Sequence, residues 1–262
     1  MNAPQTSTAL PSFRLDDRLI VVTGSGEGIG RAFAEGFALA GAHVVLASRR
    51  RGKLEEVQAA IQARGGRADV VPTDLSRLSD IAALGAAARQ LAADKQIVLV
   101  NNAGYGFTKA ALDVTEADWN GVFDVHVKGA FFCAQQFAPL MIERGYGKII
   151  NMSSTWSAMT DAGKSAYCTA KAAVSHLTAA LATEWAAAGI RVNAIAPATT
   201  MTEFVQGAAA ANPERFQKLL GKIKLGRFET TSDLLGAAIF LASGASDFVT
   251  GQTLYVDGGV TC

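Results

Sequence analysis

The chain has 262 residues, half of them hydrophobic and 18% charged, which is enough for a large buried core and excludes a disordered tail protein. Its 24 Lys and Arg residues against 23 Asp and Glu residues give a formal net charge of +1. No strong field is therefore available to hold nucleic acid or an anionic membrane, and we expect neither as a partner.

Residues 1–14 are polar and rich in Pro, Ser and Thr, and they have no secretory signal pattern. We expect them to form a flexible arm before a single domain at residues 15–262. The cysteines Cys133, Cys168 and Cys262 have no metal-ligand spacing. We interpret them as reduced thiols of a cytoplasmic protein and expect no metal site.

From Arg18 onward, short β-branched runs alternate with Ala-rich helical patterns. The predicted strands are Leu19–Thr23, His43–Ala47, Ala68–Pro72, Ile97–Asn101, Lys148–Met152, Arg191–Ala196 and Thr253–Val256. The predicted helices are Gly30–Ala40, Lys53–Arg64, Leu78–Ala93, a long one near Asp118–Arg144, and Ala166–Ala188. Several strands are apolar on both faces, which is typical of a parallel sheet covered by helices. The alternation predicts the α/β class with a doubly wound, Rossmann-type sheet in one domain. Residues 199–225 have an irregular pattern without a strand, and we expect them to form a substrate lid.

A glycine-rich segment, Thr23–Gly30, follows the first predicted strand and opens the first helix. It includes Gly24, Ser25, Gly28, Ile29 and Gly30, with glycines spaced G-x-x-x-G-x-G. Glycines at such a turn allow close approach of a pyrophosphate, whose charge is met by the helix N-terminus. The segment predicts a dinucleotide site, although a turn that only joins strand to helix would have a similar composition.

The end of the second strand bears on the choice of dinucleotide. An Asp or Glu there would hold the ribose 2′-hydroxyl of NAD, whereas this chain has Ser48, Arg49 and two further arginines. A small hydroxyl and a guanidinium suit a 2′-phosphate, which favours NADP(H) over NAD(H). Glu27 argues the other way, because its carboxylate would repel a phosphate, so NAD(H) remains an alternative.

Tyr167 and Lys171 are four residues apart in a helical pattern and therefore share one helix face. An ammonium beside a phenol favours the phenolate, so this arrangement is expected to lower the pKa of Tyr167. Such a tyrosine could exchange a proton with an alcohol or carbonyl oxygen near neutral pH. Taken alone, the pair is also a common helical spacing without chemistry.

Four motifs together resemble the short-chain dehydrogenase/reductase family: Thr23–Gly30, Asn101–Gly104, Ser153–Ser154 and Tyr167-x-x-x-Lys171. The resemblance runs from about Asp17 to Gly259, in the expected order. It implies a Rossmann fold with seven parallel strands, and hydride transfer between a nicotinamide and an alcohol or carbonyl carbon. It also implies a homotetramer that pairs the long helices after the fourth and fifth strands.

The resemblance assigns roles to individual residues. Tyr167 would be the general acid/base, Lys171 would bind the nicotinamide ribose and lower the tyrosine pKa, and Ser154 would hydrogen-bond the reacting oxygen. Asp74 and Leu75 match positions that hold the adenine, and Asn102, Ala103 and Gly104 match the turn beside the adenine ribose. The positions beside the nicotinamide amide and the phosphates are matched by Pro197, Thr200 and Thr202.

Two positions depart from the family pattern. His126 stands where the family usually has an Asn that supports a water in the proton relay. An imidazole titrates near pH 6.5, so we expect His126 to complete the relay and to add an acidic limb to the pH profile; the alternative is an impaired relay. Ala198 follows Pro197, where the family generally has Gly. Trp156 is a candidate wall of the substrate pocket, because it follows Ser154 by two positions.

The leading hypothesis is an NAD(P)-dependent oxidoreductase acting on a secondary alcohol or ketone. Around Asp118, residues 144–154 and Arg227, the chain is most similar to sugar-acid and polyol dehydrogenases such as the gluconate 5-dehydrogenases. A 3-oxoacyl-[acyl-carrier-protein] reductase is the alternative, because Lys218, Lys222, Lys224 and Arg227 could meet an acidic carrier. A third hypothesis is a non-catalytic dinucleotide-binding sensor or scaffold on the same fold.

Overall fold

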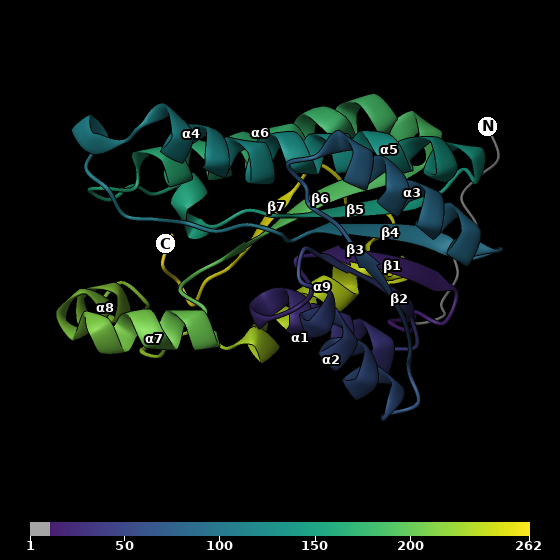
Figure 1. Cartoon of the computed structure of the whole chain (residues 1–262), viewed down its shortest axis with the longest axis horizontal. Helices are drawn as coiled ribbons and strands as arrows, with labels where there is room; N and C mark the ends of the chain where they lie inside the picture. Colours follow the sequence, from purple (N-terminus) through teal and green to yellow (C-terminus); the bar gives the residue numbers. More distant parts are fainter. Residues whose placement is uncertain (1–10) are drawn as a thin grey trace.

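A computed structural model describes residues 11–262, and its centre is a seven-stranded parallel sheet (Figure 1). The strand order is β3-β2-β1-β4-β5-β6-β7. The strands are β1 (Arg18–Thr23), β2 (His43–Ser48), β3 (Arg67–Pro72), β4 (Gln96–Asn101), β5 (Gly147–Met152), β6 (Ile190–Pro197) and β7 (Thr253–Val256). The order of the strands reverses between β1 and β4, and at such a point a doubly wound sheet opens a crevice beyond its strand ends.

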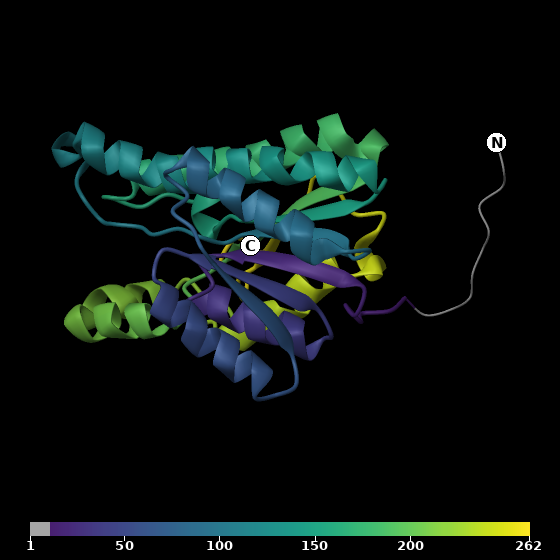
Figure 2. The same ribbon diagram turned by 45° about the vertical axis from the view of Figure 1, so that its right-hand side comes forward.

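Helices cover both faces of the sheet. They are α1 (Gly28–Leu39), α2 (Arg51–Gln62), α3 (Leu78–Ala92), α4 (Glu116–Phe123), α5 (Ala130–Glu143), α6 (Ser165–Trp185), α7 (Glu203–Ala211), α8 (Pro213–Leu220) and α9 (Leu235–Ala242). Figures 1 and 2 show α1, α2 and α9 below the sheet and α3, α5 and α6 above it. Both views also place α7 and α8 beyond the sheet, on the side of the molecule where α4 lies.

Alternating side chains of the strands feed two separate cores. In β1, Ile20 and Val22 pack with Phe33 and Phe37 of α1, whereas Leu19 and Val21 belong to the core beneath α3, α5 and α6. Both sets of strand side chains are fully buried. Because each strand is covered on both faces, β1 and its neighbours have the continuous apolar runs that a buried parallel sheet requires.

The seven predicted strands are confirmed, with bounds that differ by at most one residue at each end. The predicted long helix near Asp118–Arg144 is interrupted, because residues Asp124–Gly129 form a π-helical turn between α4 and α5. Residues 199–225, expected to be irregular, contain the helices α7 and α8. Asn212 caps α8 by accepting from the Arg215 N–H, with Pro213 at the first helical position.

The predicted N-terminal arm falls mostly at residues 1–10, outside the described residues, and residues 11–14 are exposed and form no helix or strand. Leu15 is fully buried, and its N–H donates to the carbonyl oxygen of Ala40. Within residues 11–262, no helix combines the length and the apolar character needed to cross a membrane.

Candidate active site

The loop after β1 has a backbone that depends on its glycines. Gly24 and Gly28 have φ angles of +68° and +57°, in the left-handed region that disfavours other residues. A Cβ on Gly30 would overlap the carbonyl oxygen of Gly24. The loop is therefore closed tightly against the start of α1.

The N-terminus of α1 fits an anion such as a pyrophosphate. Its N-cap residue, Glu27, makes no side-chain capping hydrogen bond, and the first turn holds no acidic residue. Helix N–H groups at such an end can bind a phosphate, assisted by the helix dipole. Thr202 lies over this end, because a Cβ on Gly28 would come 3.2 Å from its methyl group. The residues present therefore fit a dinucleotide.

Asn102 ties the glycine loop to the end of β4. Its Nδ2 donates to the carbonyl oxygens of Thr23 and Gly24, at 2.9 and 3.3 Å. The Thr23 hydroxyl accepts from the N–H groups of Asn102 and Ala103, at 3.0 and 3.1 Å. Asn102 thus has a defined structural role, because the N–H groups of its side chain donate to the backbone of the glycine loop.

The residues expected around the adenosine half lie together at the ends of β2 and β3. Ser48 is half-buried, and its carbonyl oxygen accepts from the Thr73 N–H at 2.9 Å. The pKa of Asp74 is lowered, chiefly by the hydrogen bond from the Ser76 N–H and more weakly by the charge of Arg49. Arg49 is exposed, and it is close enough to Asp74 for its charge to lower the pKa of that carboxyl group. The two residues can therefore contact the same adenosine half of a cofactor.

Glu27 is paired with a neighbouring cation. Its carboxylate lies 2.6 Å from the Arg50 guanidinium, and both side chains are well exposed. This ion pair offsets the negative charge that counted against a 2′-phosphate. Arg49 is left as the cation beside Ser48.

Other predicted cofactor residues are placed by their packing. Ser25 is fully buried and its hydroxyl accepts from the Ala47 N–H at 3.0 Å, so its side chain serves the loop itself. Ile29 packs against the core beneath α1, and Leu75 packs in the other core. Pro197 ends β6 and is buried. The Thr202 hydroxyl caps α7 by accepting from Val205 N–H.

Three predicted catalytic residues meet where β5 ends against α6. Ser154 follows β5 and is buried, and its hydroxyl lies near enough to the phenol of Tyr167 to lower the tyrosine pKa. Lys171, one turn along α6, places its Nζ 5.7 Å from the centre of the Tyr167 ring. The same Nζ donates to the Met152 carbonyl oxygen at 2.6 Å. The three side chains therefore form one constellation.

The expected lowering of the tyrosine pKa by Lys171 is wrong for this structure. Burial raises the pKa of Tyr167 to about 12, and the hydrogen bond with Ser154 opposes this only in part. Burial also lowers the pKa of Lys171 to about 7, so the amine is only partly protonated at neutral pH. The sequence argument considered the charge of the pair and left out the cost of burying both groups.

His126 lies inside the constellation. It is buried in the π-helical turn, and its ring stands edge-on to Tyr167 with 5.6 Å between centroids. Its Nε2 is 3.0 Å from the Tyr105 N–H nitrogen and 2.7 Å from the Tyr105 carbonyl oxygen. The expected acidic limb near pH 6.5 is wrong, because burial and then the charge of Lys171 lower the pKa of His126 to about 3.

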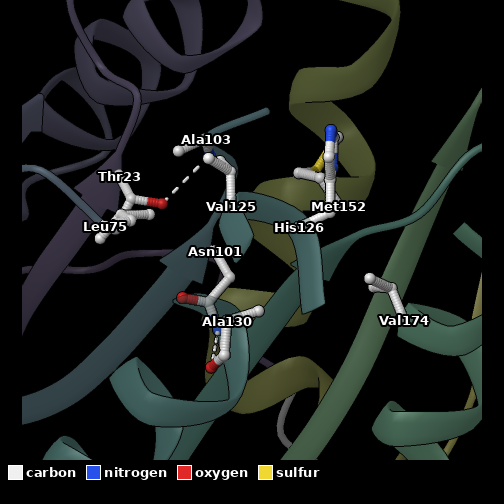
Figure 3. Close-up of a pocket in the computed structure, with 9 residues that line it drawn as sticks. All are labelled: Thr23, Leu75, Asn101, Ala103, Val125, His126, Ala130, Met152 and Val174. Carbon is white, nitrogen blue, oxygen red and sulfur yellow. Dashed lines mark hydrogen bonds between the residues drawn. The ribbon is translucent and has the colours of Figure 1, made fainter. Parts of the chain in front are cut away.

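Figure 3 shows the pocket that continues inward from this constellation, between the ends of β1, β4 and β5. His126 and Met152 form one side of it, and Thr23 and Asn101 form the other. Asn101 donates from its Nδ2 to the Ala130 carbonyl oxygen at 3.2 Å. Gly104 covers His126 so closely that a Cβ there would overlap the imidazole. The pocket therefore lies between Thr23, which precedes the glycine loop, and His126, which packs against Tyr167.

Sequence reasoning missed two charged residues near the site. Glu229 is buried, its carboxylate accepts a hydrogen bond from the Thr200 hydroxyl, and its carbonyl oxygen accepts one from the Met201 N–H at 2.7 Å. Burial raises the pKa of Glu229 to about 7. Lys164, just before α6, has its Nζ 5.7 Å from the centre of the Tyr167 ring. Both residues stand out because they are charged groups among buried or neutral neighbours. Those neighbours come together only in the folded chain, so the sequence alone does not identify either residue.

The cysteines lie outside the chemistry. Cys133 and Cys168 are buried and unpaired, whereas Cys262 is exposed. Burial raises the pKa of the Cys133 thiol to about 12 and also raises that of Cys168. Neither buried thiol is a nucleophile near neutral pH.

A family model described as enoyl-(acyl carrier protein) reductase matches residues 24–261. Galactitol 2-dehydrogenase of Rhizobium johnstonii is 40% identical over 255 residues, which cover 95% of this chain and 97% of that protein. An NAD-dependent glycerol dehydrogenase of Listeria innocua is 36% identical over 250 residues, covering 95% and 96%. A crystal structure of a gluconate 5-dehydrogenase from Burkholderia cenocepacia, in complex with NADP and tartrate, has a TM-score of 0.89 at 38% identity, covering 95% of this chain and 97% of that one.

Proposed function

The chain belongs to the short-chain dehydrogenase/reductase family, and on that basis we propose that Ser154, Tyr167 and Lys171 are its catalytic residues. The protein is an NAD(P)-dependent oxidoreductase that acts on the CH–OH group of a sugar, polyol or sugar acid. The observation that carries the assignment of residues is the placement of Tyr167 between the Ser154 hydroxyl and the Lys171 amine.

Each of the three side chains has a distinct task. The bound nicotinamide supplies the hydride acceptor or donor. Tyr167 takes the proton of the substrate alcohol during oxidation and returns it during reduction. Ser154 donates a hydrogen bond to the same substrate oxygen and stabilises the charge that develops there. Lys171 stays within reach of the tyrosine, anchored on the Met152 carbonyl oxygen, and would bind the nicotinamide ribose.

The cofactor is held at the start of α1 and at the ends of β2 and β3. Gly24, Gly28 and Gly30 leave room for the pyrophosphate, and Asp74 and Leu75 border the adenine. NADP(H) is favoured over NAD(H), since Arg49 and Ser48 suit a 2′-phosphate and Glu27 is neutralised by Arg50. The NADP of the gluconate 5-dehydrogenase structure supports this preference, and the NAD-dependent glycerol dehydrogenase argues for the alternative. Arg49→Ala should weaken NADP(H) binding about tenfold and leave NAD(H) binding unchanged.

His126 is a positioning residue in this proposal. It is neutral at physiological pH and holds the Tyr105 backbone beside Tyr167. The surroundings of His126 do not favour a proton relay through a charged imidazole, because burial and the charge of Lys171 both disfavour the imidazolium.

The carrier-protein alternative has weaker support. Two of its four basic residues are engaged, because Arg227 lies 2.7 Å from Asp233 and Lys222 lies 3.7 Å from Asp161. None of the three relatives described above is named for an acyl-carrier substrate. The sensor alternative does not explain why the serine, tyrosine and lysine meet in one cleft.

Assembly, compartment and lid complete the proposal. Residues 121–139 and α6 would supply the helices that pair in a homotetramer. The three free cysteines suit a reducing, cytoplasmic compartment. The segment at residues 199–225, with α7 and α8, would close over the substrate. Sedimentation of the purified protein tests the tetramer, and a monomer would overturn it.

Turnover and cofactor binding together test the catalytic assignment. We expect the protein to oxidise polyols or sugar acids, and the absorbance of the reduced nicotinamide measures the rate. Tyr167→Phe should lose about 10²- to 10⁴-fold in kcat and keep its cofactor affinity, measured by nicotinamide fluorescence. A Tyr167→Phe variant with full turnover would refute the assigned chemistry.

A further inference from the structure

The rim above Tyr167 carries more positive than negative charge. Lys164 before α6 and Lys222 after α8 lie there, and Arg215 on α8 is close enough to Lys164 for its charge to lower the pKa of that lysine. The Lys164 Nζ lies 5.7 Å from the centre of the Tyr167 ring, and the Lys222 Nζ lies 5.4 Å from the centre of the Trp156 ring. Both rings belong to residues near the reacting oxygen, because Trp156 follows Ser154 by two positions.

One carboxylate at this rim is already committed. Asp161 lies 3.7 Å from Lys222, and it is exposed. A second carboxylate, Asp118, lies 2.6 Å from Lys109, which fastens the neighbouring loop. Across residues 11–262, Lys164 and Arg215 form no salt bridge. The rim therefore holds two cations without an anionic partner.

Lys164 is held where a substrate would meet it. It is half-buried, and its Nζ donates to the Phe107 carbonyl oxygen at 3.0 Å. Its pKa is lowered, first by burial and then by the charge of Arg215, while Cys168 and Asp161 oppose this more weakly. An ammonium in such surroundings gains more from an anion than a solvated lysine would, because water and counter-charge stabilise it less.

We infer that Lys164, with Arg215 from the lid helix α8, binds a carboxylate of the substrate, so that the enzyme acts on polyhydroxy acids in preference to neutral polyols. This inference rests on the proposed function, and it chooses between the two substrate classes that the proposed function leaves open. A carboxylate on Lys164 would leave the remaining carbons of a short chain over Tyr167 and Ser154. The Trp156 ring, under Lys222, would bound the chain on one side.

Matched substrates isolate the carboxylate. D-Gluconate and D-glucitol share one carbon skeleton and differ at the terminal carboxylate, as do D-galactonate and galactitol. We expect the wild-type kcat/KM to be at least tenfold higher for the acid of each pair. Lys164→Met should lower kcat/KM for the acids by about 10- to 100-fold and change that for the alditols less than threefold. Lys164→Arg should retain most of the activity on acids.

Two controls separate charge from folding. Lys95→Met removes a lysine just before β4, at the end of the strands opposite the site, where its Nζ donates to the Asp16 carbonyl oxygen. It should leave kcat/KM unchanged for the acids and for the alditols. Raising the salt concentration should increase KM for the acids and leave KM for the alditols constant. Cofactor affinity, measured by nicotinamide fluorescence, should be the same in all variants.

The outcomes distinguish this inference from the proposed function. Equal or better turnover of alditols, with Lys164→Met affecting both classes alike, would overturn the carboxylate site and leave the dehydrogenase intact. Cofactor binding without turnover of any acid or alditol would overturn both. A selective loss on acids in Lys164→Met, rescued by Lys164→Arg, would establish the site.

Discussion

The imidazole of His126 stands at 88° to the ring of Tyr167, with 5.6 Å between the two centroids. The same imidazole lies beneath Gly104 and contacts the backbone of Tyr105. A Cβ on the next glycine, Gly106, would come 3.0 Å from the Tyr167 ring. His126 therefore sets how closely this loop approaches Tyr167, which is a steric role and does not require a charge.

The neutral state of His126 makes its contribution to stability depend on pH. Its pKa is about 3 in the folded protein, against 6.5 as a free group, so the unfolded chain binds more protons between these values. Stability from this residue is complete above pH 6.5 and is lost as the pH falls. Between pH 7.5 and pH 5.0 the loss should be about 2 kcal/mol, and His126→Asn should reduce it. Urea unfolding at the two pH values measures the difference.

The rate profile gives an independent check on His126. We expect His126→Asn to leave the shape of the kcat profile between pH 5 and pH 8 unchanged, because the imidazole does not titrate there in the folded protein. An acidic limb near pH 6.5 that disappears in His126→Asn would contradict the neutral positioning role and restore the relay hypothesis.

Glu229 should have the opposite pH dependence. The pKa of Glu229 is about 7 in the folded protein, above its usual value of 4.5, first because the side chain is buried. The folded state therefore binds more protons between these values, and stability falls as the pH rises through them. Glu229→Gln keeps a partner for the Thr200 hydroxyl and removes the charge. It should be more stable than the wild type by on the order of 3 kcal/mol at pH 8 and similar to it at pH 4.5.

Glu229→Ala is the matched control. It removes the charge and the hydrogen-bond partner of Thr200 together, and it leaves a cavity beside Thr200. We expect it to be less stable than Glu229→Gln at both pH values, measured by thermal unfolding. If Glu229→Gln instead lost stability at pH 8, the side chain would be ionised and favourable in the folded protein.

The buried ammonium of Lys171 should lower the free energy of unfolding, although the proposed catalysis requires this residue. Burial lowers its pKa from 10.5 to about 7, so its contribution to stability rises with pH from 7 to 10.5 and the full cost of the buried ammonium applies below pH 7. Lys171→Met removes this cost and also the bond to the Met152 carbonyl oxygen. At pH 6 we expect a net gain of about 2 kcal/mol in the free energy of unfolding, together with loss of turnover. A lower melting temperature at pH 6 would show that the ammonium is well stabilised in place.

The glycine loop offers a test that needs no substrate. Gly30→Ala would force its Cβ into the Gly24 carbonyl oxygen, so the loop must open and the cofactor affinity should fall at least tenfold. Gly236→Ala, within α9, has no atom within 4 Å of the added Cβ, and should gain up to about 1 kcal/mol from helix propensity. Fluorescence titration with NADPH measures the first effect and urea unfolding measures the second.

The strands could be predicted from the sequence because each is buried on both faces. Runs such as Leu19–Thr23 therefore carry the signal in their own composition. The predicted catalytic residues Ser154, Tyr167 and Lys171 are brought together as expected, since each lies at a strand end or on one helix face. These features depend on local pattern and on spacing, both of which a sequence displays.

Other features depend on contacts that the sequence does not display. Helix α7 is short and rich in Ala, and it has no buried residue to mark one face. Helix α8 is different, because the spacing of Phe216, Leu219 and Leu220 is a helical signal that the sequence prediction missed. The π-helical turn at Asp124–Gly129 depends on backbone register, and the residues there have the same composition as an α-helix. The pKa values of Tyr167, Lys171 and His126 depend on burial, which only the folded chain defines.

The distribution of the cysteines makes the chain suitable for site-specific labelling. Two thiols are shielded and held as unreactive thiols, and Cys262 is the exposed one. A maleimide dye added to the folded native sequence should attach at Cys262, without prior mutagenesis. Because labelling at Cys262 leaves both buried thiols unmodified, the labelled protein should remain competent for single-molecule and anisotropy measurements of its assembly.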